Sequence, residues 1–199
     1  MSFEKIQIFI HENKQKFLFV LVGGIVFFGL LAGWQAWSTF RENKAVASYV
    51  GSEGDSSKLE AVIHDFGGSK VALLAQVDLA ILAQEEKNWS LCQERFERLY
   101  TAAKRKIFFR VFALHGIGYC QREEGKFSEA ALTFERAAQE PGHVNPAVSR
   151  LEAARSLDLG KDPKAEESYT KLLEEKDLSP ELKAQIEEKL KWLRDQKKS

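Results

Sequence analysis

The longest hydrophobic stretch of the chain runs from Phe17 to Phe40 and contains no charged residue. As a helix with a rise of about 1.5 Å per residue it would be roughly 36 Å long, more than a bilayer hydrocarbon core of about 30 Å. Charged residues border the stretch on both sides. Trp34 and Trp37 lie near its end, where amphipathic rings favour the lipid headgroups. The pattern predicts a transmembrane helix over residues 17–40.

A stretch of this kind has two alternatives to a membrane anchor. A buried helix of a soluble domain is disfavoured, because the rest of the chain is not apolar enough to surround it. A cleaved signal peptide usually has an apolar region of about 7–15 residues that ends in a small-x-small site. The candidate sites are poor: Ala36-Trp37-Ser38 contains a tryptophan suited to the interface, and Ala45-Val46-Ala47 lies beyond charged residues. The sequence therefore favours an uncleaved anchor.

Residues 1–16 carry a shorter amphipathic pattern, with Phe3, Ile6, Phe9 and Ile10 at helical spacing and charged residues between them. This predicts a short N-terminal amphipathic segment at the membrane interface. Basic residues are about equally numerous on both sides of the predicted span. The positive-inside rule therefore favours a cytoplasmic N-terminus only slightly.

After the span, residues 41–70 are predicted to form a linker and the first helices. Residues 41–50 can continue the membrane helix, and a polar, glycine-containing stretch then interrupts it. An apolar face from Leu59 to Phe66 follows at helical spacing. Gly67-Gly68 is typical of a helix end, where glycine adopts the left-handed conformation.

From residue 71 the pattern of apolar and small residues repeats. The positions between Leu79 and Leu99 recur between Ile117 and Ala137 at an offset of 38, and a third copy ends near Leu172. Periods of this length are typical of helical solenoids. One such repeat cannot bury its own apolar face, so three stacked copies form the minimal stable unit.

The second copy follows the tetratricopeptide pattern most closely, with Gly118, Ala130 and Phe134 at the expected spacing. In that pattern a small residue on the second helix lets the two helices approach, and an aromatic residue fills the adjacent space. Gln121 replaces the usual aromatic residue, so the repeats depart from the ideal. Ala130 is predicted to lie at the closest approach of the two helices, and Ala131 is predicted to tolerate a larger side chain.

The chain closes with a further predicted helix. Ser179-Pro180-Glu181 is a strong start signal, with a capping serine, a proline at the first position and an acid in the first turn. An apolar stripe then runs from Leu182 to Leu193. The sequence thus predicts an all-α chain: a single N-terminal transmembrane helix, then a tetratricopeptide-like α-solenoid over residues 71–199 with a C-terminal capping helix.

Charge and motif content argue against several functions. Because residues 1–40 contain three Lys and two Glu, the remainder carries 26 basic and 27 acidic residues. Such a balance disfavours nucleic-acid binding and electrostatic binding to an anionic membrane surface. The four His are scattered, and no His-Glu-x-x-His, phosphate-binding glycine loop, Gly-x-Ser-x-Gly or cysteine cluster occurs. The sequence predicts a protein that is not an enzyme, with no catalytic residues, cofactor or metal.

The two cysteines occupy positions where small side chains are expected. Cys92 matches Ala130 in the repeat, and Cys120 lies two residues after Gly118. In an oxidising compartment a bridge between them would be stabilising, but the pattern favours two buried small apolar residues. Free thiols are predicted.

The order of these features resembles a known family. A single N-terminal span ending in Gly33-Trp34-x-x-Trp37, a short helix pair, degenerate repeats and a final Ser179-Pro180-x-Leu182 helix are similar to the YfgM-type ancillary subunit of the bacterial Sec translocon. The resemblance implies an inner-membrane protein with a cytoplasmic N-terminus and a periplasmic tetratricopeptide-like domain. It also implies association with the translocon, with periplasmic chaperones and with emerging secreted chains.

Two candidate recognition elements follow from the predicted register. The first helices of successive repeats line a concave groove in tetratricopeptide folds, and aromatic and Arg side chains there are typical peptide anchors. Packing against neighbouring helices is the alternative for the aromatic residues, and Phe108, Phe109 and Phe112 could equally be core. In the membrane helix, Gly29 and Gly33 would permit close approach of another helix. The predicted groove residues are Leu74, Val77, Ile81, Gln84, Phe112, His115, Tyr119 and Arg122.

Two functions therefore remain open. The first is a membrane-tethered scaffold that serves or escorts chains at the Sec translocon, binding unfolded or peptide segments. The second is a membrane-anchored tetratricopeptide adaptor in another envelope or cofactor-assembly complex, or a cytosol-facing receptor. The topology of the chain separates the cytosolic version from the others.

Overall fold

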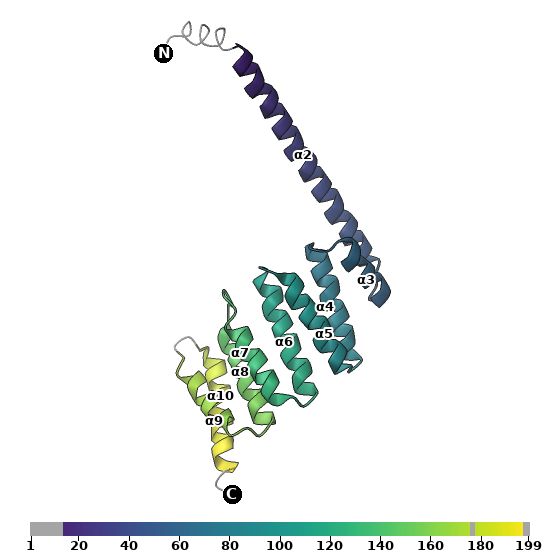
Figure 1. The fold of residues 1–199 in the computed structure, drawn as a ribbon. Coiled ribbons are helices and arrows are strands. Elements are labelled where there is room, and N and C mark those ends of the chain that lie inside the picture. Colours follow the sequence, from purple (N-terminus) through teal and green to yellow (C-terminus); the bar gives the residue numbers. More distant parts are fainter. Residues whose placement is uncertain (1–13, 176–177, 197–199) are drawn as a thin grey trace, which may run out of the picture. The chain divides into compact units, whose positions relative to one another are not determined.

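A computed structural model of the protein describes residues 14–175 and 178–196, and within them every regular element is an α-helix. The predicted all-α class is confirmed, whereas the predicted amphipathic segment falls mainly outside the described residues. The helices, shown in Figure 1, are α2 (Lys14–Val50), α3 (Ser56–Asp65), α4 (Lys70–Glu85), α5 (Trp89–Ala103), α6 (Ile107–Glu123), α7 (Phe127–Ala138), α8 (Pro146–Leu159), α9 (Lys164–Leu173) and α10 (Pro180–Gln196).

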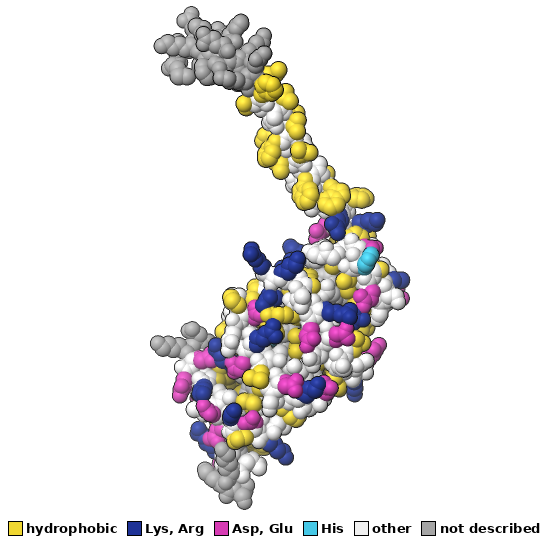
Figure 2. Space-filling view, viewed as in Figure 1, with side chains coloured by type: hydrophobic (Ala, Val, Ile, Leu, Met, Phe, Trp, Pro, Cys, Tyr) yellow, Lys and Arg dark blue, Asp and Glu magenta, His cyan; other side chains and the backbone are white. Residues whose placement is uncertain are grey.

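The chain divides into two compact units between Ala47 and Ser48. Helix α2 makes up the described part of the first unit and extends well beyond the predicted span of residues 17–40. Its apolar side chains are exposed along its length, as Figure 2 shows. In the described ranges, α2 is the one helix that is long and apolar enough to cross a membrane, by its length and composition.

The second unit is a stack of antiparallel helices in which each helix from α3 to α10 packs mainly against its neighbours in the sequence (Figure 1). Alternate helices are also joined. Arg95 on α5 contacts Glu60 on α3, and Arg122 on α6 contacts Glu152 on α8. Lys189 on α10 likewise contacts Asp158 on α8, so α6, α8 and α10 present a common face, on which the candidate site lies.

Helix α6 is held between two aromatic side chains, one from α5 and one from α7. A Cβ atom added at Gly116 would lie 2.4 Å from the ring of Phe96, and one added at Gly118 would lie 2.8 Å from the ring of Phe134. Both rings are almost fully buried. The two glycines are thus required for close packing, because no larger side chain fits without displacing a core ring.

The predicted position of Ala130 inside the helix pair is confirmed, since its side chain is 0 % exposed and lies in a cluster with Phe134. The prediction for Ala131 is wrong. Ala131 is only 5 % exposed and packs in the same cluster, together with Ala153 of α8. Helix α7 is covered by α6 on one side and by α8 on the other, so its buried arc is wider than a single helix pair requires.

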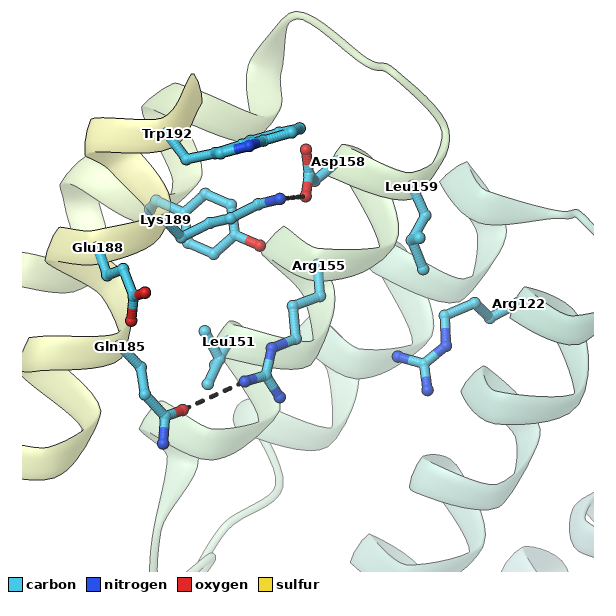
Figure 3. A pocket seen from close by; sticks show the side chains of 10 residues that line it. Arg122, Leu151, Arg155, Asp158, Leu159, Gln185, Glu188, Lys189 and Trp192 are labelled. Carbon is cyan, nitrogen blue, oxygen red and sulfur yellow. Dashed lines mark hydrogen bonds and ion pairs between the residues drawn. The ribbon is translucent and has the colours of Figure 1, made fainter. Parts of the chain in front are cut away.

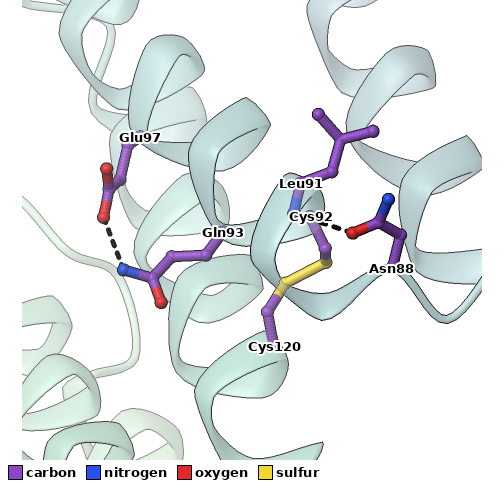
Figure 4. The surroundings of a disulfide bond; sticks show 6 residues. All are labelled: Asn88, Leu91, Cys92, Gln93, Glu97 and Cys120. Carbon is purple, nitrogen blue, oxygen red and sulfur yellow. Dashed lines mark hydrogen bonds between the residues drawn. A yellow bond between two sulfur atoms is a disulfide. The ribbon is translucent and has the colours of Figure 1, made fainter. Parts of the chain in front are cut away.

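The prediction of free thiols is also wrong, because Cys92 and Cys120 form a disulfide (Figure 4). Cys92 lies near the start of α5 and Cys120 near the end of α6. The two helices are antiparallel, so these ends face each other, with a Cα–Cα distance of 6.1 Å. Both sulfur atoms belong to fully buried residues of the core between α4, α5 and α6.

The final helix begins as predicted, with the Ser179 hydroxyl accepting a hydrogen bond from the backbone N–H of Leu182 at 3.3 Å. The centre of the predicted apolar stripe is buried, and Leu182 and Leu193 at its two ends are half-buried. Ile186 and Leu190 are in the core, where they pack with Tyr169 of α9 and Leu151 of α8. Helix α10 therefore covers the apolar end of the stack.

Candidate protein-binding face

The eight predicted groove residues are divided between two helices. On α4, Leu74 and Ile81 are exposed, while Gln84 is half-buried and Val77 packs partly against the core. On α6, Phe112 is exposed and the other three predicted residues are half-buried. On α6, Phe112 and His115 line one cavity and Arg122 lines a second, whereas Tyr119 and the four α4 residues line neither.

The first cavity lies between α6, the loop after α7 and the start of α8, and is called the α6–α8 pocket here. It has a volume of about 550 Å³, within the range of about 300–1,000 Å³ that is usual for ligand pockets. Phe108 is 72 % exposed and Val144 is 97 % exposed, so the pocket has large apolar side chains at its edges. It is lined by Ile107, Phe108, Val111, Phe112, His115, Gly142, His143, Val144, Asn145 and Val148.

The floor of the α6–α8 pocket is fixed by one hydroxyl group and two imidazoles. The Oγ atom of Ser149 lies 2.7 Å from Nε2 of His115 and 2.8 Å from Nε2 of His143. The backbone N–H of Asn145 donates to Nδ1 of His143, so the proton of this ring is on Nε2 and is donated to Ser149. The serine hydroxyl then donates to His115. A directed chain of hydrogen bonds thus joins α6, the α7–α8 loop and α8.

The pKa values of both histidines in this set of hydrogen bonds are lowered, which favours their neutral forms. Burial lowers the pKa of His115, and the nearby His143 lowers it further, against an opposing effect of Glu152. Burial also lowers the pKa of His143, with a contribution from Arg150. A hydroxyl beside an imidazole is also the arrangement of a catalytic nucleophile, but Ser149 is 0 % exposed. Its hydroxyl joins the imidazoles of His115 and His143, which line the pocket.

The other two α6 residues of the predicted groove lie toward the end of the helix. Arg122 contacts the Glu152 carboxylate at 2.7 Å, and Arg155 contacts the same carboxylate at 2.6 Å. Burial works to raise the pKa of Glu152, but hydrogen bonds from the two guanidinium groups outweigh it and the pKa is lowered. Tyr119 packs its ring edge-on against Trp89, with a centroid distance of 6.2 Å. Arg122 is therefore a bridge between α6 and α8.

A second cavity, of about 560 Å³, lies beyond this bridge and is called the α8–α10 pocket (Figure 3). The Lys189 ammonium lies 4.0 Å from the centroid of the Trp192 ring and 2.7 Å from Asp158. Arg155 donates to Gln185 across the cavity at 3.2 Å. The side chains of Lys189, Asp158 and Arg155 are therefore paired with other groups of the cavity wall. The lining residues are Arg122, Leu151, Arg155, Asp158, Leu159, Tyr169, Gln185, Glu188, Lys189 and Trp192.

The sequence pattern did not identify several residues of this face. Val144 and Val148 belong to the α7–α8 loop and to α8, where the repeat pattern is out of phase. Trp192 is 50 % exposed and lies outside the apolar stripe of α10, which is a signal that could have identified it. The sequence leaves open whether Phe108 is a core residue, and in the structure it is mainly exposed.

In the first unit, Gly29 and Gly33 lie on one side of α2 beside Trp34 and Trp37, where they line a shallow hollow. A Cβ atom at either glycine would meet no other atom within 4 Å. The predicted contact of these glycines with another membrane helix stays a prediction.

Within the described part of the chain, no group of three or more His, Cys, Asp or Glu side chains is placed to hold a metal ion. Comparison with protein-family models, with curated protein sequences and with solved structures found no match to this chain.

Proposed function

We propose that the protein is a membrane-tethered protein-interaction scaffold of the YfgM type, which serves secreted chains and periplasmic chaperones at the Sec translocon. In this proposal α2 is an uncleaved transmembrane anchor, and the second unit is a tetratricopeptide-like solenoid. The close packing of Phe134 on Gly118, at positions given by the repeat, supports the solenoid assignment. The length and hydropathy of α2 support the anchor.

The disulfide supports the orientation of the chain in the membrane. Stable disulfides form in oxidising compartments such as the bacterial periplasm and are rare in the cytosol. A fully buried bridge between Cys92 and Cys120 is therefore expected on the oxidising side, with the N-terminus in the cytoplasm. This observation favours the periplasmic scaffold over a cytosol-facing receptor.

The observation that carries the binding role is the α6–α8 pocket. A domain that exposes Phe108, Phe112 and Val144 around one concave apolar surface has a surface suited to another protein. The hydrogen-bonded floor at Ser149 holds the pocket in one shape, so binding does not require the site to be ordered first. The hollow at Gly29 and Gly33 is proposed as a second contact, with a membrane helix of the translocon.

The proposal is tested by topology and by co-purification. A reporter that is active only outside the cytoplasm, fused after the last residue, should be active. The full chain, solubilised in mild detergent, should co-purify with translocon subunits. A variant in which an unrelated transmembrane helix replaces α2 should co-purify with a smaller amount of these subunits. An inactive reporter, or co-purification with another envelope complex and not with the translocon, would contradict the proposed role.

A further inference from the structure

One buried side chain of the α8–α10 pocket carries a polar group without a partner. Tyr169 on α9 is 1 % exposed, and its ring packs with Leu151 and Ile186. Among the residues that the structure describes, no group forms a hydrogen bond with its hydroxyl. In the same ranges, Oε1 of Gln76 is the one buried side-chain polar atom that has neither a partner nor solvent access. The Tyr169 oxygen therefore has access to the cavity that this residue lines.

This hydroxyl is available as a hydrogen-bond donor. Burial raises the pKa of Tyr169, and the nearby Asp158 carboxylate raises it further, against an opposing effect of Arg155. The phenol therefore stays neutral and keeps its proton. A buried tyrosine usually has a partner for its O–H group, and a donor left unpaired lowers the stability of the fold. A ligand atom that accepts this hydrogen bond would remove that cost.

The charges around the cavity are balanced in number. Three cations line it, and three carboxylates pair with them or line it as well. The cations are Arg122, Arg155 and Lys189, and the carboxylates are Glu152, Asp158 and Glu188. A charged ligand would gain little net attraction here and would lose its hydration. The acceptor that fits this cavity is therefore neutral, such as an amide carbonyl.

The edges of the cavity carry exposed apolar side chains. Leu159 and Trp192 are each about half exposed, and they reach the cavity from α8 and α10 (Figure 3). Such side chains favour an apolar group of the ligand, because burial removes both surfaces from water. An uncharged peptide segment supplies the two features together, since each residue has a backbone carbonyl beside its side chain.

The α8–α10 pocket continues the face that carries the α6–α8 pocket. On α6, His115 lines one cavity and Arg122 lines the other, two helical turns or about 10 Å apart. On α8, Val148 and Leu151 line the two cavities in the same order. An extended chain advances about 3.3 Å per residue, so about three or four residues cover this distance. One segment can therefore reach both pockets.

We propose that the α8–α10 pocket binds the backbone of an extended, uncharged protein segment, one of whose peptide carbonyls accepts a hydrogen bond from Tyr169. The adjacent side chain of the segment packs against Leu159 and Trp192. This inference rests on the proposed function, in which this face binds other proteins. It adds a second binding position, which selects a neutral backbone and not a charged group.

The chemistry of the pocket is tested with three small probes and the full chain in nanodiscs of neutral lipid. The probes are 3-phenylpropanamide, 3-phenylpropanoate and 3-phenylpropylammonium, which share the apolar group and differ in charge and in the acceptor. Saturation-transfer NMR measures their dissociation constants, with nanodiscs that lack the protein as background. The amide should bind most tightly, about fivefold more tightly than the ammonium, from one neutral hydrogen bond.

Two pairs of variants separate the hydroxyl from the apolar edge. Tyr169→Phe removes only the hydroxyl, so it should weaken the amide about fivefold, leave the ammonium unchanged and not lower Tm. Its control, Tyr119→Phe, alters a residue that lines neither cavity and should change nothing. Leu159→Ser alters an exposed side chain and should weaken all three probes, whereas Leu132→Ser, an exposed position on α7, should weaken none.

A longer ligand links this pocket to the α6–α8 pocket. A capped peptide of about eight Ala, Leu and Phe residues should displace the amide probe. Val144→Asp, at the other pocket, should weaken the peptide and not the amide. If Tyr169→Phe weakens the peptide but Val144→Asp does not, this inference holds and the binding role of the α6–α8 pocket fails.

Four results would overturn the inference. Tighter binding of the carboxylate or of the ammonium than of the amide would make the pocket a site for a charged ligand. A lower Tm of Tyr169→Phe with unchanged amide binding would give the hydroxyl a purely structural role. Amide binding that the peptide does not displace would make the cavity a site for small molecules only. Absence of binding by all three probes would leave the cavity without the proposed role.

Discussion

Removal of the disulfide is the perturbation for which the structure gives the clearest magnitude. The bridge joins Cys92 to Cys120, which are separated by 28 residues and lie at facing ends of two antiparallel helices. It therefore closes a loop that contains nearly all of α5 and α6. Both residues are fully buried in the main core cluster, so the bond lies within the packed interior.

The expected loss of stability follows from the length of this loop. In the chain-entropy account, a loop of this size restricts the unfolded state by about 3.6 kcal/mol at room temperature. For a domain of roughly 150 residues, each kcal/mol shifts the melting temperature by about 2–4 °C, so reduction should lower Tm by roughly 7–14 °C. The Cys92→Ala/Cys120→Ala variant should lose a similar amount. Replacing the two cysteines with serine should lower the stability further, because each hydroxyl would be buried without a hydrogen-bond partner.

The assay is thermal unfolding of the full chain in detergent, followed by circular dichroism at 222 nm before and after reduction. Because the bond is buried, reduction is carried out in denaturant and the protein is refolded with reductant present. Mass spectrometry should show two added alkyl groups only after reduction. The double alanine variant serves as a control that reductant should not affect. Equal melting temperatures for the oxidised and reduced protein, within about 2 °C, would refute the reasoning.

Two further predictions concern the core and the pocket floor. Ala130→Leu should overpack the contact between α6 and α7 and lower the free energy of unfolding by about 1–3 kcal/mol, whereas Ala184→Leu, on the exposed side of α10, should have little effect in the same denaturant titration. The lowered pKa values of His115 and His143 mean that the folded state binds fewer protons than the unfolded state, so stability should be full above about pH 6.5 and fall as the pH is lowered from there toward 5. Replacing both histidines with Gln should flatten the pH dependence of Tm in this window, and an unchanged slope would contradict the assignment.

Features with strong local signals were predictable from the sequence. The apolar run of α2, the start of α10 at Pro180 and the burial of Ala130 each follow from patterns within one or two helical turns. The glycine at 118 was identified because the repeat fixes its place opposite Phe134. In each case a short stretch of sequence specifies both the element and the face that it buries.

Features that depend on more than one helix pair were not predictable. The burial of Ala131 results from α8, which packs on the side of α7 away from α6. The disulfide forms because the start of α5 and the end of α6 lie close together, and the sequence alone does not give that distance. The position of Val144 is set by the loop conformation, which the Asn145 contact to His143 fixes. These are effects of tertiary packing, which the repeat period describes only on average.

The central claim, that the α6–α8 face is the protein-binding surface of a membrane-tethered scaffold, is tested most directly by photo-crosslinking in cells. A photoreactive amino acid is placed at Val144, at the edge of the pocket, or at Leu132, an exposed aliphatic position on α7. The account predicts adducts from position 144 with translocating secreted chains or periplasmic chaperones, and few from position 132. Equal adducts from both positions, or adducts from position 132 alone, would contradict it.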